Sequence, residues 1–369
     1  MRFPIMQNHR FEVLDYLRGI MAVTIIIWHY RHFYLYDPGM VLPSASVFPL
    51  YAYLQPLYEG KVRAVEIFWV LSGFVFCAAY NGKCVSVYEF TVNRISRLYP
   101  LHVVTLLFLA AIALFGFHDW PSGIIYFHDD LYHFMLQLFF ASYWGFEKGN
   151  SFNGPIWSVS LEFVIYFVFL FILRASRGVL ALPVVIAAMA LSLLAFVNLP
   201  DPIQRFALCA AYFFVGVSVC VARGTARYIL ISSTLGAVGL AAAVIWVWPA
   251  DTKKVLWMLT GAILTAILSH PQIESQITRL CDRVRVREAM KRLGDISYGI
   301  YLVHVPVQTA IIAASKLGWI RIESLRGEWY FLLLYVVLVL MLANWAYLTI
   351  ERPLQKYIRS KTLHRASVS

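Results

Sequence analysis

An arginine and a histidine share the first apolar segment of the chain, LDYLRGIMAVTIIIWHY. Arg18 and His29 are eleven residues apart, close to three helical turns, so both side chains lie on nearly one helix face, about 16 Å apart. A guanidinium and an imidazole at membrane depth are costly and usually mark a polar pathway or a functional site. The alternative is that each side chain snorkels to the nearer membrane surface.

Two carboxylates occur at a depth similar to that of His29 in later apolar segments. Glu66 precedes FWVLSGF, and Glu162 lies in GPIWSVSLE, where Trp157 and Ser160 are supporting residues. A buried carboxylate beside an imidazole orients the ring and raises its basicity. We therefore predict His29 as a general base that Glu66 or Glu162 orients. A covalent intermediate on Ser160 or His29, and a helix-packing role for Glu162, stay open.

A second polar group is expected at the opposite depth. Asp15 can pair with Arg18 one turn away, and Arg94 and Arg97 are spaced to hold a phosphate-bearing ligand, or to anchor a helix in the cytoplasm. An ion pair before a proline, as in the closing ERP motif, is also typical of a helix end. The residues assigned to this depth are Arg18, Arg94, Arg97, Tyr301, His304, Glu351 and Arg352.

The elements that position these residues are membrane spans. The chain is 60% hydrophobic and 14% charged, which excludes an ordinary soluble enzyme and predicts an all-α, polytopic membrane protein. The segment 131–144 is short for a span and predicts a re-entrant or interfacial helix. The ten predicted spans are 12–33, 62–80, 98–117, 156–173, 179–197, 203–222, 228–248, 255–270, 297–315 and 329–350.

Charge distribution predicts the orientation of the chain. Most of the 31 lysine and arginine residues fall in loops on one side if both termini are cytoplasmic, as the positive-inside rule requires. The net charge of +11 is spread over separate loops, so we expect contact with the lipid bilayer and no nucleic acid. The basic segment 279–292 fits either lipid contact or ligand recruitment. No metal-ligand spacing is present.

Together and in this order, the motifs resemble the acyltransferase-3 family of integral membrane O-acyltransferases. The resemblance covers residues 9–355 as one domain, followed by a short basic tail, 356–369. It rests on LDYLRG with His29, FWVLSGF, the Arg94/Arg97 pair, GPIWSVSLE, SYGIYLVH and ERP. Tyr16 and Phe163 stand where relatives often have other residues. The C-terminal hydrolase-like domain of some members is not expected here.

The resemblance implies about ten helices, essential roles for Arg18 and His29, and a donor-side role for Arg94 and Arg97. It implies acyl-CoA, usually acetyl-CoA, as a cytoplasmic co-substrate, with no permanently bound cofactor. The acceptor is expected to be an extracytoplasmic glycan or glycolipid, such as O-antigen, exopolysaccharide or a nodulation factor, at the bacterial inner membrane.

We expect a central polar pore in which Arg18, Arg94, Arg97, Tyr301, His304 and Arg352 bind the donor. A transporter or flippase is the main alternative, because it also explains intramembrane charges. A structural membrane protein whose buried charges only specify helix packing is the other.

Overall fold

The computed structural model describes residues 10–36, 41–60, 62–115, 124–176, 200–223 and 252–366. Within these ranges the regular structure is helical and no strand occurs, which confirms the all-α prediction. The predicted spans 179–197 and 228–248 lie outside the described residues. Six described helices are long and apolar enough to cross a membrane, or seven if the bent pair of α10 (Thr252–Leu268) and α11 (Pro271–Arg283) counts as one.

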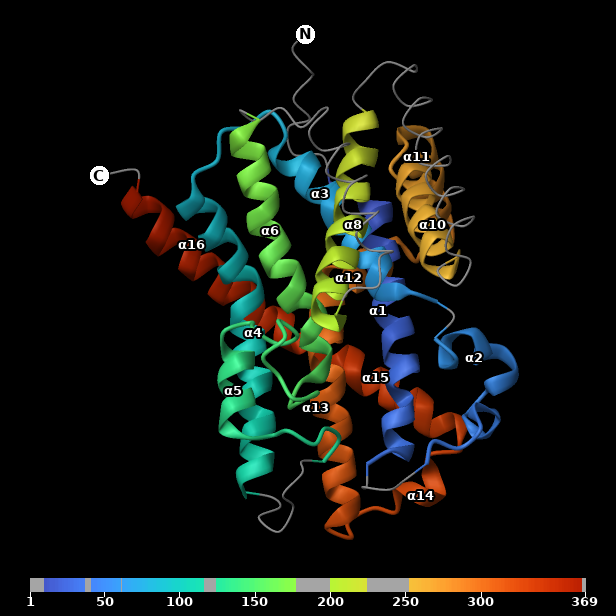
Figure 1. Ribbon diagram of the computed structural model, residues 1–369. Coiled ribbons are helices and arrows are strands. Elements are labelled where there is room, and N and C mark those ends of the chain that lie inside the picture. Colours follow the sequence, from blue (N-terminus) through green and yellow to red (C-terminus); the bar gives the residue numbers. More distant parts are fainter. Residues whose placement is uncertain are drawn as a thin grey trace.

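The helices that surround the candidate site are upright and neighbouring (Figure 1). They are α1 (Glu12–His29), α3 (Ala64–Tyr80), α4 (Val87–Phe115), α6 (Trp157–Ala175), α8 (Asp201–Arg223) and α13 (Ser297–Lys316). Helix α13 is the most deeply buried of the candidate spans, with 83% of its apolar window inside the protein.

Shorter elements connect and cap this bundle. They are the 3-10 turns η1 (Tyr30–Tyr34), η2 (Ala45–Val47) and η3 (Gly154–Ile156), and the helices α2 (Tyr51–Tyr58), α5 (Leu131–Leu138), α12 (Arg287–Asp295) and α14 (Ile322–Leu325). Helix α5 is shorter than the helix predicted over 131–144. It stops at Leu138 because Phe140 and Tyr143 adopt left-handed backbone angles, with φ of 54° and 65°.

Helices α3 and α8 pack with their backbones in contact. A Cβ atom on Gly73 would lie 1.8 Å from the Phe213 carbonyl oxygen, and one on Gly216 would lie 1.9 Å from the Val70 carbonyl oxygen. Only glycine permits so close an approach, as at other intramembrane helix crossings. Because Gly73 belongs to the FWVLSGF motif, part of that motif serves helix packing.

Two helices extend beyond the predicted spans. The third span was expected to begin near residue 98, but α4 begins at Val87 and continues through Pro100. The last span was expected to end near residue 350. Instead α15 (Trp329–Ala346) runs through a π turn (η5, Tyr347–Glu351) into α16 (Arg352–Ala366), so most of the predicted basic tail is helical. Helix α16 packs against α4.

The basic segment 279–292 is also helical, in α11 and α12. Arg287 on α12 binds Glu12 on α1 at 3.0 Å and Asp282 on α11 at 2.9 Å. Lys291 approaches the same Glu12 carboxylate at 3.5 Å. These two cations therefore fasten α12 to the start of α1, the helix that carries Arg18 and His29.

Candidate active site

A cavity of about 490 Å³ lies among α1, α3, α4, α6, α13 and α16. We call it the arginine chamber. Its volume lies within the range of ordinary ligand pockets. Positive charge dominates its lining, since five arginines face three carboxylates. The charged residues are Arg10, Arg18, Arg94, Arg97 and Arg359 with Asp15, Glu162 and Asp295.

Neighbouring groups hold several of these arginines in place. Arg10 bridges Asp15 at 2.7 Å and Asp295 at 2.5 Å, and Asp15 also meets Arg18 at 3.3 Å. Arg94 donates to the Tyr80 hydroxyl at 3.3 Å, with its guanidinium 4.6 Å from the centre of the Phe76 ring. Its Nε is buried without a hydrogen-bond partner. A buried donor without a protein partner is uncommon and can donate to a bound anion.

The sequence motifs do not include Arg359, which the structure brings to the arginine chamber. Its Nε donates to Ser96 on α4 at 3.3 Å. Arg352, which was predicted on the donor side, is exposed and lines neither this cavity nor the one described next. A signal for Arg359 was present in the basic tail. The ERP motif is typical of a helix end, so the sequence alone does not predict that a helix continues to Arg359.

A second cavity, of about 380 Å³, contains His29 and Glu66. We call it the histidine chamber. Its four charged side chains form two ion pairs. Arg63 pairs with Glu66 at 3.4 Å, and Arg205 pairs with Asp201 at 2.9 Å. Aromatic side chains line much of the remaining wall. They are Trp28, Trp69, Trp157, Tyr212 and Tyr301.

The ring of His29 is oriented by its own helix. Its Nδ1 lies 2.9 Å from the Ile25 carbonyl oxygen, so Nδ1 carries the proton and donates it there. The lone pair is then on Nε2, as a general base requires. A backbone carbonyl therefore does the orienting that was predicted for Glu66 or Glu162. Glu66 shares the chamber with His29, but its ion-pair partner is Arg63.

The expected depth groups are corrected at two positions. Glu162 was expected beside His29, but it lies on the arginine chamber, where Ser72 and Tyr166 also line the wall. His304 was expected with the donor-side residues. Its ring centre instead lies 4.7 Å from that of His29, and it lines neither chamber. Counting residues along each span does not give the relative heights and rotations of the helices, which decide these neighbours.

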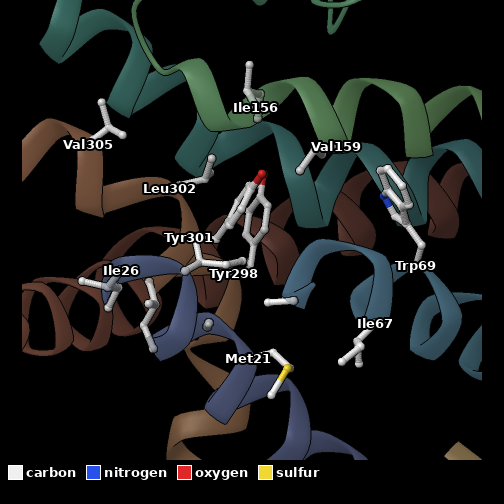
Figure 2. Close-up of a cluster of buried hydrophobic side chains, with 14 of the residues drawn as sticks. Met21, Ile26, Ile67, Trp69, Ile156, Val159, Tyr298, Tyr301, Leu302 and Val305 are labelled. Atoms are coloured by element: carbon white, nitrogen blue, oxygen red, sulfur yellow. The ribbon is translucent and has the colours of Figure 1, made fainter. Parts of the chain in front are cut away.

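Three residues, Val65, Trp69 and Tyr301, line both chambers and form the wall between them. Figure 2 shows Tyr301 on α13 near Ile156 of η3 and Val159 of α6, with Trp69 of α3 nearby. The Tyr301 hydroxyl is 2.7 Å from Ser158 Oγ and also bonds to the Pro155 carbonyl oxygen. GPIWSVSLE therefore supplies the partners of Tyr301.

The remaining predicted residues support this region without reaching a ligand space, except Trp157, which lines the histidine chamber. Ser160 is fully buried, and its hydroxyl has no partner. Glu351 is buried in the π turn, and its Oε1 would lie 3.0 Å from a Cβ on Gly299. Neither Ser160 nor Glu351 lines a chamber.

One group of potential metal ligands occurs in the part of the chain that the structure describes: His128, Asp130 and His133. The hydrogen bonds of His133 already use both ring nitrogens. Nδ1 donates to Asp130 at 2.8 Å, and Nε2 accepts from the Lys148 backbone N–H at 3.1 Å. A metal on His133 would displace one of these bonds, so we interpret the group as a fastening between α5 and its loop.

Comparison with known proteins assigns this architecture. The acyltransferase domain of the acyltransferase-3 family matches residues 11–348. Nodulation protein 10 of Rhizobium leguminosarum bv. viciae is 25% identical, over 98% of this chain and 97% of its own. Acyltransferase MdmB of Streptomyces mycarofaciens is 24% identical, over 80% of this chain and 81% of its own. No solved structure gives a significant match. The family match spans nearly the whole chain, so this protein belongs to the acyltransferase-3 family of multi-pass membrane acyltransferases.

Proposed function

We propose that this protein transfers an acyl group, expected to be acetyl, from cytoplasmic acyl-CoA to a hydroxyl of an extracytoplasmic glycan at a bacterial inner membrane. One observation carries the proposal. An arginine-rich cavity and a cavity with an oriented histidine share a single wall. Such a pair of cavities can admit an anionic donor on one side and a hydroxyl acceptor on the other.

The arginine chamber fits the donor. Coenzyme A carries several phosphates, and guanidinium groups bind phosphate oxygens in bidentate geometry. Arg94, Arg97 and Arg359 converge on this cavity from two helices. With the phosphates held there, the pantetheine arm would extend toward Trp69 and Tyr301 and present the thioester at the wall.

The histidine chamber fits the acceptor. Indole rings stack on sugar faces, and Trp69 and Trp157 line this cavity. The charges of Arg63 and Arg205 are each paired with a carboxylate inside the chamber. We therefore expect an uncharged glycosyl residue to bind better than an acidic one.

The reaction follows from the tautomer of His29. Nε2 takes the proton of the acceptor hydroxyl while its oxygen attacks the thioester carbonyl. The new C–O bond forms, the C–S bond breaks, and the proton passes from His29 to the leaving sulfur. Direct transfer needs no covalent enzyme intermediate.

The test uses membranes that contain wild type, His29→Gln or His102→Gln, supplied with labelled acetyl-CoA and a glycan extract. His102 is a matched control, because it is buried on α4, lines neither chamber and donates to the Gln137 carbonyl, which a glutamine N–H can replace. We expect base-labile label in glycan with wild type and His102→Gln only. Glycan movement across the membrane without acetyl-CoA consumption would instead identify a transporter.

A further inference from the structure

The indole of Trp69 is a hydrogen-bond donor without a protein acceptor, although the residue is only 3% exposed. In the described part of the chain, no residue accepts a hydrogen bond from its Nε1–H, and this nitrogen remains accessible rather than sealed by its neighbours. A buried tryptophan normally finds an acceptor for its N–H. The N–H of Trp69 is therefore free to donate to a ligand.

Trp69 belongs to the wall between the two chambers. Its ring makes edge-to-face contacts with Trp157 and Tyr212, whose ring centres are 5.8 Å and 6.2 Å away. In Figure 2 its nitrogen is on the edge of the ring nearer to Tyr301. A donor that packing fixes beforehand needs no reorganisation during a reaction, which is what makes it effective in catalysis.

The proposed reaction creates a negative charge at this wall. When the acceptor oxygen attacks the thioester, the carbonyl oxygen becomes an oxyanion before the C–S bond breaks. The sulfur is on the side of the arginine chamber, and the attacking oxygen comes from the histidine chamber. The oxyanion is therefore directed toward the wall itself, where a fixed donor would stabilise it.

The other polar groups near the wall are occupied or too distant. The Tyr301 hydroxyl donates to a backbone carbonyl, and Ser158 Oγ is bonded to the same hydroxyl. The third wall residue, Val65, has no donor in its side chain. Arg18 is about 16 Å from His29 along α1, too far for both to contact one thioester.

We propose that Trp69 is a catalytic residue whose Nε1–H stabilises the oxyanion of the tetrahedral intermediate. The hydrogen bond strengthens as the carbonyl oxygen gains negative charge and weakens when the carbonyl re-forms in the ester product. The indole keeps its proton throughout. The inference rests on the proposed transfer reaction and gives Trp69 a role in the chemical step, besides the stacking face that it offers a sugar.

The experiment removes the N–H and keeps the ring. Trp69→Phe keeps an aromatic face, whereas 3-benzothienylalanine, introduced at position 69 by amber suppression, keeps the bicyclic shape with sulfur in place of N–H. We measure kcat per folded enzyme, using size-exclusion profiles in detergent for the folded fraction, together with KM for acetyl-CoA. For both variants we expect kcat to fall about 100- to 1000-fold. KM should stay within about 2-fold, because bound acetyl-CoA carries no oxyanion.

Trp144→Phe is the matched control, because it also removes an indole N–H but lies outside both chambers. Its kcat should stay within about 2-fold of wild type. An unchanged kcat for the benzothienylalanine variant, with active wild type, overturns the role of Trp69 alone and leaves it a packing residue. A raised KM at unchanged kcat would overturn that role in favour of substrate binding. Wild-type enzyme without any transfer would overturn the proposed function as well.

Discussion

The bond from His29 Nδ1 to the Ile25 carbonyl leaves Nε2 as the nitrogen that can accept a proton in the proposed reaction. His29→Gln keeps an N–H donor in the side chain but has no titratable nitrogen. We expect normal expression and a fall in transfer of about 10²- to 10⁴-fold, the usual contribution of general base catalysis. Initial rates with labelled acetyl-CoA measure this change. Wild-type rates in the variant would remove His29 from the chemistry.

Arg94 on α4 and Arg359 on α16 are the basis of a second prediction. Arg94→Ala and Arg359→Ala each remove a guanidinium from the arginine chamber, so KM for acyl-CoA should rise about 10-fold or more while kcat changes less. Arg352→Ala is the matched control on α16, because Arg352 is exposed and outside both chambers. Equal effects of Arg352→Ala and Arg359→Ala would contradict a phosphate-binding role.

Local pairs could be predicted from the sequence, and long-range pairs could not. Asp15 with Arg18, and Arg94 with Arg97, follow from helical spacing alone. The neighbours of Glu162 and His304 depend on the rotation and height of whole helices. No residue near His304 in the sequence indicates that it faces His29, 275 positions earlier.

At the scale of elements, the close crossing of α3 and α8 limits which substitutions the two helices tolerate at their contact. Gly73→Ala and Gly216→Ala each add a Cβ against a backbone carbonyl of the other helix. We expect each to destabilise the protein by about 1–3 kcal/mol, as overpacking does. Thermal unfolding in detergent checks this. Gly327→Ala is the control, because no atom lies within 4 Å of its added Cβ, and an equal loss there would contradict the explanation.

The segment before α5 predicts a pH dependence. Asp129 lies outside the candidate spans, and burial raises the pKa of its carboxyl from 3.8 to about 6. The folded state therefore binds this proton more tightly than the unfolded state does. The resulting stabilisation of the folded state is fully present below about pH 4 and is lost as the pH rises through about 6. Asp129→Asn keeps an oxygen acceptor for the Phe152 backbone N–H.

Asp129→Asn should accordingly lose less stability than wild type between pH 5 and pH 7.5. Differential scanning fluorimetry of the purified protein gives Tm at both values. The same fall of Tm in variant and wild type would show that another group controls this range.

Helix types and most span positions could be predicted, but two helices extend beyond the predicted spans. Proline disfavours a helical residue before it and lacks an N–H. Helix α4 nevertheless continues through Pro100. Before Pro353 the chain widens into a π turn, with the Arg352 N–H bonded to the Tyr347 carbonyl. Such turns inside helices often lie at functional sites. This one carries the helix onward and delivers Arg359 to the cavity.

For the whole molecule, the two chambers predict sided use of the substrates. In sealed inverted membrane vesicles, added labelled acetyl-CoA should reach the arginine chamber and label glycan trapped inside. Right-side-out vesicles should require permeabilisation. Equal labelling of both vesicle types without permeabilisation would contradict the predicted orientation, in which both termini are cytoplasmic.

The wall of Val65, Trp69 and Tyr301 also affects ion leakage across the membrane. An acyl group carries no charge, so its passage does no work against the membrane potential. An ion leaking along the same path would dissipate about 2.3 kcal/mol per elementary charge at 100 mV. With bulky aromatic rings between the two chambers, the proposed transfer to surface sugars leaves the proton gradient across the same bilayer intact.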